Sequence, residues 1–258
     1  MNLLQDEIAQ LQSMKTYPKQ IFYDGDLELL NRVKISVVGS RRPTKYSRLE
    51  IQKLSSSLSK SGICTVSGGA MGIDAVAHAG AGASNTIAVL PCGIDIRYPS
   101  VNKNLLNEIQ KNGLLLSQFD PGFRSTPWSF VVRNELVVAL GDVLVVGEAE
   151  LNSGTMRSVE FAIKMKKEIF VLPQRVGESE GSNRLLKDNI AKAIYDIDEF
   201  IARFSTDKKL HVKTDAFLDF CKTNPSYEEA LKLHKEKIFE AELNGEIEIV
   251  NGRVLPLL

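Results

Sequence analysis

Six short apolar runs, separated by segments with helical periodicity, limit the possible folds of this chain more than any other feature. The runs do not alternate apolar and polar residues, which is typical of strands covered on both faces of a parallel sheet. They span residues 35–38, 63–66, 86–90, 114–118, 143–146 and 169–172. Because right-handed crossovers place helices on both faces, we expect an α/β fold with a Rossmann-like doubly wound, mostly parallel sheet over residues 33–204.

Segments with apolar residues at helical spacing are predicted to connect these strands. In the first of them, Ile51, Leu54 and Leu58 fall on one face and Gly62 follows as a stop signal. The predicted helices span residues 44–60, 71–79, 102–111, 133–140 and 155–166. Residues 1–32 form a short N-terminal extension in this prediction, with a short helix at 7–14 and a strand and turn at 17–26.

The end of the chain has a different pattern. Residues 205–214 are polar and charged, and we interpret them as a linker. Two helices are predicted at 215–222 and 227–244, and two short strands at 246–250 and 253–257 flank an Asn-Gly pair that is typical of a hairpin turn. This order predicts a small winged-helix-like domain over residues 215–258.

Composition restricts the possible functions. Acidic and basic residues number 32 each, so any phosphate-binding surface must be a local concentration of charge. No apolar run is long enough for a membrane span, and three cysteines without a CxxC pair favour reduced thiols in the cytoplasm. The sequence has no clustered metal ligands and no nucleophile–base series, so we predict no catalytic residue, no metal and no cofactor.

The first strand ends in a turn that suits an anion. Gly39 allows the backbone to approach an oxyanion closely, Ser40 can donate a hydrogen bond, and Arg41 and Arg42 can bind phosphate through two parallel hydrogen bonds. Ligands of α/β proteins bind at the carboxyl ends of the strands. A tight turn with two solvated arginines is the structural alternative.

The second strand ends in the sequence SGGAMGID at residues 67–74. We expect Gly68 and Gly69 to expose backbone N–H groups to a phosphate at the start of the next helix. The spacing is not GxGxxG, and GxxxxGK[ST] is absent, so neither common nucleotide motif is present. Asp74 and His78, four residues apart, form a pair that is more often structural than catalytic.

Residues 123–134 join a strand to a helix and combine arginines with aromatic residues. Arg124 and Arg133 with Phe130 form the combination that binds single-stranded nucleic acid, through phosphate contact and base stacking. A core position is the alternative: it is equally weighted for Phe130 and favoured for Trp128. Residues 152–155 and 181–183 each precede a predicted helix, either as N–H cradles or as caps.

Taken in order, these motifs resemble the DprA/Smf family of DNA-processing proteins of natural transformation, in particular its members from epsilon-proteobacteria. The motifs are VVGSRRP at 37–43, SGGAMGID at 67–74 with Ala77-His78, LPCG at 90–93 with Tyr98-Pro99, RN at 133–134, SGT at 153–155, and VLP at 171–173 with GSN at 181–183. The resemblance covers about residues 17–204. It implies a core that binds and protects single-stranded DNA, loads the RecA recombinase and forms a homodimer.

The turns and the resemblance together predict a set of DNA-binding residues. They are Gly39, Ser40, Arg41, Arg42, Gly68, Gly69, Arg124, Phe130, Arg133, Asn134, Ser153, Gly154 and Asn183. Two positions depart from the family pattern. Met71 stands where many members have a cation, and Glu135 stands where many have an arginine, so we expect Glu135 to point away from the phosphate site.

Two alternatives remain. The chain also resembles, more faintly, the LOG-like phosphoribohydrolases of nucleoside monophosphates, through residues 152–155. The catalytic glutamate of that family would fall at Ser158, and Glu160 is two residues late. A protein-interaction role for the C-terminal module is the second alternative, because its longer helix carries acidic and basic residues in balance.

Overall fold

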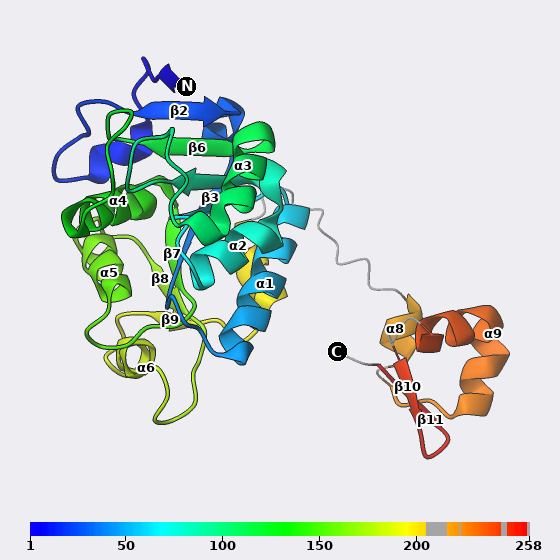
Figure 1. Cartoon of the computed structure of the whole chain (residues 1–258). Coiled ribbons are helices and arrows are strands. Elements are labelled where there is room, and N and C mark those ends of the chain that lie inside the picture. The colour runs from blue at the N-terminus through cyan, green and yellow to red at the C-terminus, as the bar shows by residue number, and fades with distance from the viewer. Residues whose placement is uncertain (205–215, 222, 244–246, 257–258) are drawn as a thin grey trace. The chain divides into compact units, whose positions relative to one another are not determined.

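The computed structural model describes residues 1–204, 216–221, 223–243 and 247–256. It divides into two compact units, Met1–Phe204 and Ser205–Leu258, and the first unit includes residues 1–32. One nine-stranded sheet, with the order β1-β2-β6-β5-β4-β3-β7-β8-β9, forms the centre of the first unit (Figure 1). Its strands are β1 (Asn2–Leu3), β2 (Phe22–Gly25), β3 (Lys34–Val38), β4 (Cys64–Ser67), β5 (Thr86–Val89), β6 (Leu114–Ser117), β7 (Val143–Val146), β8 (Ile169–Val171) and β9 (Lys192–Ala193).

The six strands predicted from the apolar runs are all present, within one residue at either end, and they pair in parallel from β6 to β8. The mostly parallel Rossmann-like prediction is therefore confirmed. β2 pairs antiparallel with β6, and β1 pairs antiparallel with β2, so the N-terminal segment extends the sheet. The sequence did not predict β1 and β9, because two residues are too few to show a pattern.

Helices cover both faces of the sheet (Figure 1). Side chains of β3 alternate between the faces: Ile35 and Val37 pack with Leu54 of α1, whereas Val38 belongs to the cluster that includes Val137 of α4. The helices are α1 (Lys45–Lys60), α2 (Ile73–Ala81), α3 (Lys103–Asn112), α4 (Pro127–Leu140), α5 (Gly154–Lys164), α6 (Glu180–Lys187) and α7 (Ile197–Ala202). Four short 3-10 segments complete this unit: η1 (Ala9–Ser13), η2 (Leu27–Asn31), η3 (Ala83–Asn85) and η4 (Ser100–Asn102).

Helix α4 begins six residues earlier than predicted, at Pro127 instead of Arg133. Thr126 is its N-cap, and a capping box joins the side chains and backbone N–H groups of Thr126 and Ser129. Proline suits the first helical position because its missing N–H needs no partner there. The prediction that residues 127–132 belong to a connecting segment is therefore wrong, and the signal that indicates the helix is Thr-Pro followed by Ser129.

The second unit contains α8 (Ala216–Cys221), α9 (Tyr227–Leu243), β10 (Ile247–Val250) and β11 (Arg253–Pro256). The predicted hairpin is confirmed, since Val250 pairs with Arg253 and both turn residues, Asn251 and Gly252, have positive φ. Phe217, Ile238 and Val254 are among the residues of its separate core. The predicted linker at 205–214 lies outside the described residues, and the winged-helix-like assignment stays a prediction.

Candidate functional site

The strand order reverses between β3 and β7, because β4 to β6 lie on one side of β3 and β8 lies beyond β7. The loops that follow β3 and β7 therefore diverge and leave a crevice at the carboxyl edge of the sheet, where α/β proteins bind ligands. A cavity of about 600 Å³ lies there. It is lined by Val38, Gly39, Ser40, Arg41, Gly68, Ala70, Asp74, Pro127, Phe130, Val131, Arg133, Asn134, Val137, Glu150, Ser153, Gly154, Thr155, Arg157 and Ser158.

The turn after β3 is held from two sides. The Ser40 N–H donates to the carbonyl of Glu148 at 2.8 Å, and the Ser40 carbonyl accepts from the N–H of Ile73 at 3.0 Å. The buried Glu148 carboxylate accepts both the N–H and the hydroxyl of Thr44, the N-cap of α1, at 2.8 and 2.9 Å. The backbone of Arg41 is thus fixed between α1, α2 and the loop that follows β7.

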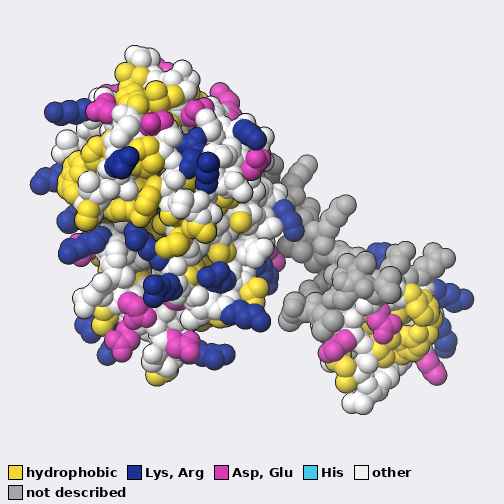
Figure 2. Space-filling model, in the orientation of Figure 1, with side chains coloured by type: hydrophobic (Ala, Val, Ile, Leu, Met, Phe, Trp, Pro, Cys, Tyr) yellow, Lys and Arg dark blue, Asp and Glu magenta, His cyan; other side chains and the backbone are white. Residues whose placement is uncertain are grey.

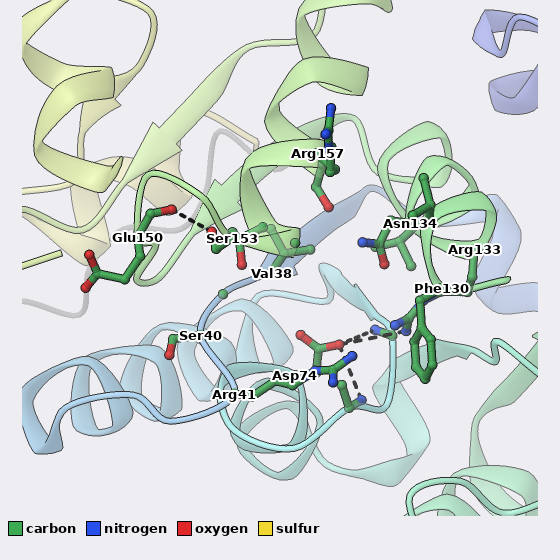
Figure 3. A pocket seen from close by; sticks show the side chains of 18 of the residues that line it. Val38, Ser40, Arg41, Asp74, Phe130, Arg133, Asn134, Glu150, Ser153 and Arg157 are labelled. Carbon is green, nitrogen blue, oxygen red and sulfur yellow. Dashed lines mark hydrogen bonds and ion pairs between the residues drawn. The ribbon is translucent and has the colours of Figure 1, made fainter. Parts of the chain in front are cut away.

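The Arg41 side chain lines the cavity. Its guanidinium carbon is 5.0 Å from the centre of the Phe130 ring, a cation–π contact. In the described part of the chain, no carboxylate lies within 4.0 Å of the Arg41 guanidinium. Figure 3 shows Arg41 beside Asp74 and near Phe130. Arg41 is therefore a cation whose hydrogen-bonding groups remain open to a ligand.

The turn after β4 differs from its prediction. The N–H groups of Gly68 and Ala70 both donate to Oδ2 of Asp74, at 3.1 and 3.3 Å, and the Gly69 N–H donates to Nε2 of His78 at 3.2 Å. The expectation that this turn presents bare N–H groups to a phosphate is therefore wrong. Asp74 and His78, one helical turn apart on α2, take the place that an anion would occupy.

His78 is held in one neutral tautomer. The Thr86 hydroxyl donates to the carbonyl of Thr65 at 2.8 Å, so it accepts from Nδ1 of His78, 2.7 Å away. Nε2 is then the acceptor for Gly69. Burial is the main cause, and the neighbouring Arg133 charge a smaller one, that together lower the pKa of His78 to about 3. The interpretation of the Asp74/His78 pair as structural agrees with this geometry.

Arg133 is buried, with 3% of its surface exposed. Its Nη1 donates to the carbonyl of Val89 at 3.2 Å and lies 3.9 Å from Oδ2 of Asp74. Burial raises the pKa of Asp74, and Arg133 opposes that rise. Arg133 therefore organises the turn after β4, and its Nε has no partner among the described residues.

The start of α5 presents the free N–H groups that the second turn lacks. Ser153 is the N-cap, but its hydroxyl donates to the carbonyl of Glu150 at 2.7 Å and caps no N–H group of the helix. The first N–H groups of a helix have no partner within it, and Gly154 and Thr155 line the cavity. An uncapped helix start facing a cavity favours an anion.

Arg157 is a cavity residue that the sequence reasoning missed. It lies one turn into α5, three residues after Gly154, so both fall on the same face of the helix. Its pairing with Glu160 at 3.0 Å is exposed and therefore weak. The helical spacing from the predicted residues Ser153 and Gly154 is the signal that indicates it. Figure 3 shows Arg157 on the opposite side of the cavity from Arg41.

The aromatic residues of α4 divide into two groups. Phe130 is half-buried in the cavity wall, and its ring centre lies 5.7 Å from that of Tyr98. Asn134 lines the same wall one turn further along. Trp128 is 61% exposed, so the preference for a core position there is wrong. Glu135 points away, as expected, because its carboxylate accepts from the N–H of Lys15 at 3.4 Å outside the cavity.

Four predicted residues do not line the cavity. Gly69 is buried within the turn after β4, and Arg42 and Arg124 are exposed outside the cavity lining. The Asn183 amide donates to the carbonyls of Arg175 and Glu178, both at 3.0 Å, which closes a loop before α6. Their contacts with DNA stay predictions. The other nine predicted residues all line the cavity.

The described residues contain no group of three or more potential metal-binding side chains. The helices among them include none that is both long and apolar enough to cross a bilayer.

The fold and the site define a class of protein: a Rossmann-like α/β protein whose switch-point cavity combines arginines, an uncapped helix start and an aromatic ring. Residues 6–205 match the family of DNA recombination-mediator protein A. The chain belongs to this family.

Individual relatives agree with that assignment. DNA processing protein DprA from Streptococcus pneumoniae is 34% identical over 191 residues, which cover 72% of this chain and 67% of that protein. Protein Smf from Synechocystis is 35% identical over 172 residues, which span 65% of this chain and only 43% of the longer relative. The structure of DNA processing protein A from Helicobacter pylori, described for its single-stranded DNA binding mode, has a TM-score of 0.77 and 40% identity over 78% of this chain and 94% of that one.

Proposed function

We propose that this protein binds single-stranded DNA in the cavity between β3 and β7, and that it protects incoming DNA during natural transformation. The observation that carries the proposal is the contact between Arg41 and Phe130, which places a cation with free hydrogen-bonding groups directly beside an aromatic face. Phosphates and bases alternate along a nucleic-acid strand over distances similar to the 5.0 Å between Arg41 and the Phe130 ring. Arginine with aromatic rings is the usual combination for binding single strands.

Phosphate would be bound from two sides of the cavity. Arg41 supplies a two-pronged charged donor from the turn after β3. The uncapped N–H groups at Gly154 and Thr155 supply neutral donors at the positive end of α5. Buried Arg133 adds positive potential behind the turn after β4, although its own hydrogen bonds go to the protein.

Basic and acidic residues are equal in number, so a phosphate-binding site must be local. Figure 2 shows Lys and Arg side chains interspersed with Asp and Glu over the visible face, and formal charges cancel over the chain. A duplex requires an extended basic surface for its two backbones. A single strand needs only a short cationic groove with stacking partners, so we propose a preference for single strands.

Further parts of the proposal rest on the family. They are delivery of the bound strand to the RecA recombinase, a homodimer, and a cytoplasmic location. The similarity to DprA proteins supports all three.

An enzymatic role on nucleotides receives little support from the geometry. The position where the LOG-like family carries a glutamate is occupied by Ser158, which is 1% exposed at the cavity wall. Glu160 is paired with Arg157 outside that wall. Asp74 is engaged by two N–H groups and Arg133. We therefore propose a binding protein. Release of adenine from AMP incubated with the protein would contradict this.

The test of DNA binding compares Arg41→Ala with a matched control, Arg48→Ala, which removes an exposed arginine on α1 outside the cavity. Anisotropy of labelled oligo-dT measures affinity at several salt concentrations. Arg41→Ala is expected to weaken binding about tenfold or more and to lower the log–log salt slope by roughly 0.7, the value for one phosphate on a single strand. Arg48→Ala should bind as the wild type does. Equal affinity of Arg41→Ala and wild type would contradict the proposed site.

A further inference from the structure

The first turn of α4 is unusually exposed for a segment that adjoins a cavity. Trp128 is 61% exposed, and Thr126, Pro127 and Val131 are also exposed. Pro127 and Val131 line the cavity as well. Figure 2 shows hydrophobic side chains gathered on this face near α4. The surface around Trp128 is therefore continuous with the proposed DNA site.

The Trp128 ring is held in place and does not lie loosely on the surface. Its centre is 5.8 Å from that of Phe119, with 71° between the planes, an edge-to-face arrangement. Phe119 is 6% exposed and stacks on Phe123 at 4.7 Å. The contact fixes one side of the indole and leaves the rest open. A rigid aromatic ring with a free face is suited to stacking on a flat ligand.

We propose that Trp128 forms a second base-stacking position, outside the cavity, for the DNA strand that leaves Phe130. This inference rests on the proposed function. Phe130 and Trp128 are two residues apart on α4, with Cα atoms about 5 Å apart. Their side chains point to different sides of the helix, so the strand crosses its exposed first turn at Pro127.

A cation stands close to this position in the sequence. Arg124 is exposed and lies in the loop that leads into α4, four residues before Trp128. In the described part of the chain, no carboxylate lies within 4.0 Å of its guanidinium. An exposed arginine and an exposed aromatic residue are thus four positions apart in the chain here, without the cation–π contact that joins Arg41 to Phe130. A base is favoured over an apolar partner as the occupant because the exposed ring is accompanied by an unpaired charge.

The experiment uses the full-length protein with oligo-dT. Trp128 is the only tryptophan of the chain, so tryptophan emission reports on this position alone, and we expect DNA to quench it. Affinity is measured separately by anisotropy of the labelled oligonucleotide. An abasic oligomer of the same length retains the phosphates and removes the bases, and it should leave the emission unchanged.

Substitutions separate stacking from folding. Trp128→Leu is expected to weaken oligo-dT binding roughly five- to a hundredfold, the range for loss of one stacked base, and Trp128→Phe should restore most of it. Tyr195→Leu removes an aromatic ring that is 87% exposed and outside the cavity, and it should have no effect. The thermal unfolding midpoint of Trp128→Leu should equal that of the wild type within a few degrees.

Each other outcome overturns the inference. If wild-type protein binds oligo-dT without a change in emission and Trp128→Leu binds equally well, the second position does not exist while the cavity proposal stands. If wild-type protein does not bind oligo-dT at all, both the proposed function and this inference are wrong. Emission that changes with protein concentration in the absence of DNA would instead assign Trp128 to a contact between copies of the chain.

Discussion

Arg133 Nη1 lies 3.9 Å from Oδ2 of Asp74, and both side chains are almost completely buried beneath the turn after β4. The same carboxylate oxygen accepts the N–H groups of Gly68 and Ala70. One carboxylate therefore satisfies a buried charge and two backbone donors at once. The sequence predicts an open anion-binding turn here. In the structure the Asp74 carboxylate already occupies that position.

Removal of that carboxylate is expected to destabilise the fold strongly. Asp74→Ala leaves buried Arg133 without its counter-ion and two N–H groups without an acceptor, so we expect a loss of about 3–5 kcal/mol in the free energy of unfolding. Asp74→Asn keeps one acceptor oxygen and should lose less. Urea unfolding followed by circular dichroism measures both.

An exposed ion pair provides the control for this prediction. Glu160→Ala removes the partner of Arg157, and both side chains of that pair are at least half exposed. Its effect should be about 0.5 kcal/mol or less. A loss for Asp74→Ala as small as that for Glu160→Ala would show that the buried pair contributes nothing to stability.

At the turn after β4, local sequence patterns indicate the strand and the turn but not the hydrogen-bond partners of the turn. Apolar runs and helical spacing predicted the six central strands, because burial on both faces of a sheet leaves a local signal. The glycines at 68 and 69 predicted a tight turn at the right place. The acceptors of their N–H groups are side chains of α2, so they depend on how that helix is oriented against the turn. No local sequence pattern indicates this orientation.

The same distinction applies to the residues in and around the cavity: those marked by a local motif were predicted, and the exposure of Trp128 was not. Arg41, Phe130 and Ser153 were predicted because each stands at a recognisable turn or cluster, and all three line the cavity. Trp128 was assigned to the core because tryptophan usually is buried. Its exposure follows from the early start of α4 at Pro127, which depends on a capping box that the periodicity of the helix interior does not reveal.

His78 predicts a dependence of stability on pH. Its pKa is about 3 in the folded protein and 6.5 in the unfolded chain. Between these values the unfolded state binds a proton that the folded state does not, so this contribution to stability is lost as the pH falls from about 6.5 towards 3. From about pH 7.5 to about pH 5.5, the loss should be about 1.4 kcal/mol.

Comparison with a variant isolates this single group. His78→Gln offers an acceptor for the N–H of Gly69 and has no titrating group at this position, so its unfolding free energy should fall less over the same interval. Groups shared by the two proteins cancel in the difference. Parallel pH profiles for His78→Gln and wild type, measured by urea unfolding, would refute the assignment of a neutral, buried His78.

Gly72 couples the two turns and offers a matched pair of substitutions. It has φ 80° and ψ −128°, and a Cβ atom there would lie 2.2 Å from the carbonyl oxygen of Ser40. Gly82 has φ 75° and ψ 152°, with no atom within 4 Å of such a Cβ. Alanine is strained at both positions by about 1–3 kcal/mol, but only Gly72→Ala also displaces the turn that carries Arg41.

The two variants should therefore differ in DNA binding as well as in stability, because the overlap at Gly72 adds to the backbone strain that both share. We expect Gly82→Ala to bind oligo-dT as the wild type does once both are measured well below their unfolding temperatures. Gly72→Ala should bind about tenfold more weakly, comparable to loss of a charged hydrogen bond. Equal affinities of the two variants would mean that the position of the Ser40 carbonyl has no influence on the Arg41 site.

Glu150 is an exposed carboxylate at the cavity wall, on the loop between β7 and α5. A negative charge there repels the backbone of a bound strand, so Glu150→Gln is expected to strengthen oligo-dT binding roughly two- to fivefold at low salt, with a smaller gain at high salt because the repulsion is screened. Glu108→Gln, which changes an exposed carboxylate on α3 outside the cavity, is the matched control and should leave affinity unchanged. Both are measured by anisotropy across a salt series. If Glu150→Gln and Glu108→Gln bind with the same affinity, the strand does not pass beside the start of α5, and the phosphate contacts proposed for Gly154 and Thr155 are wrong.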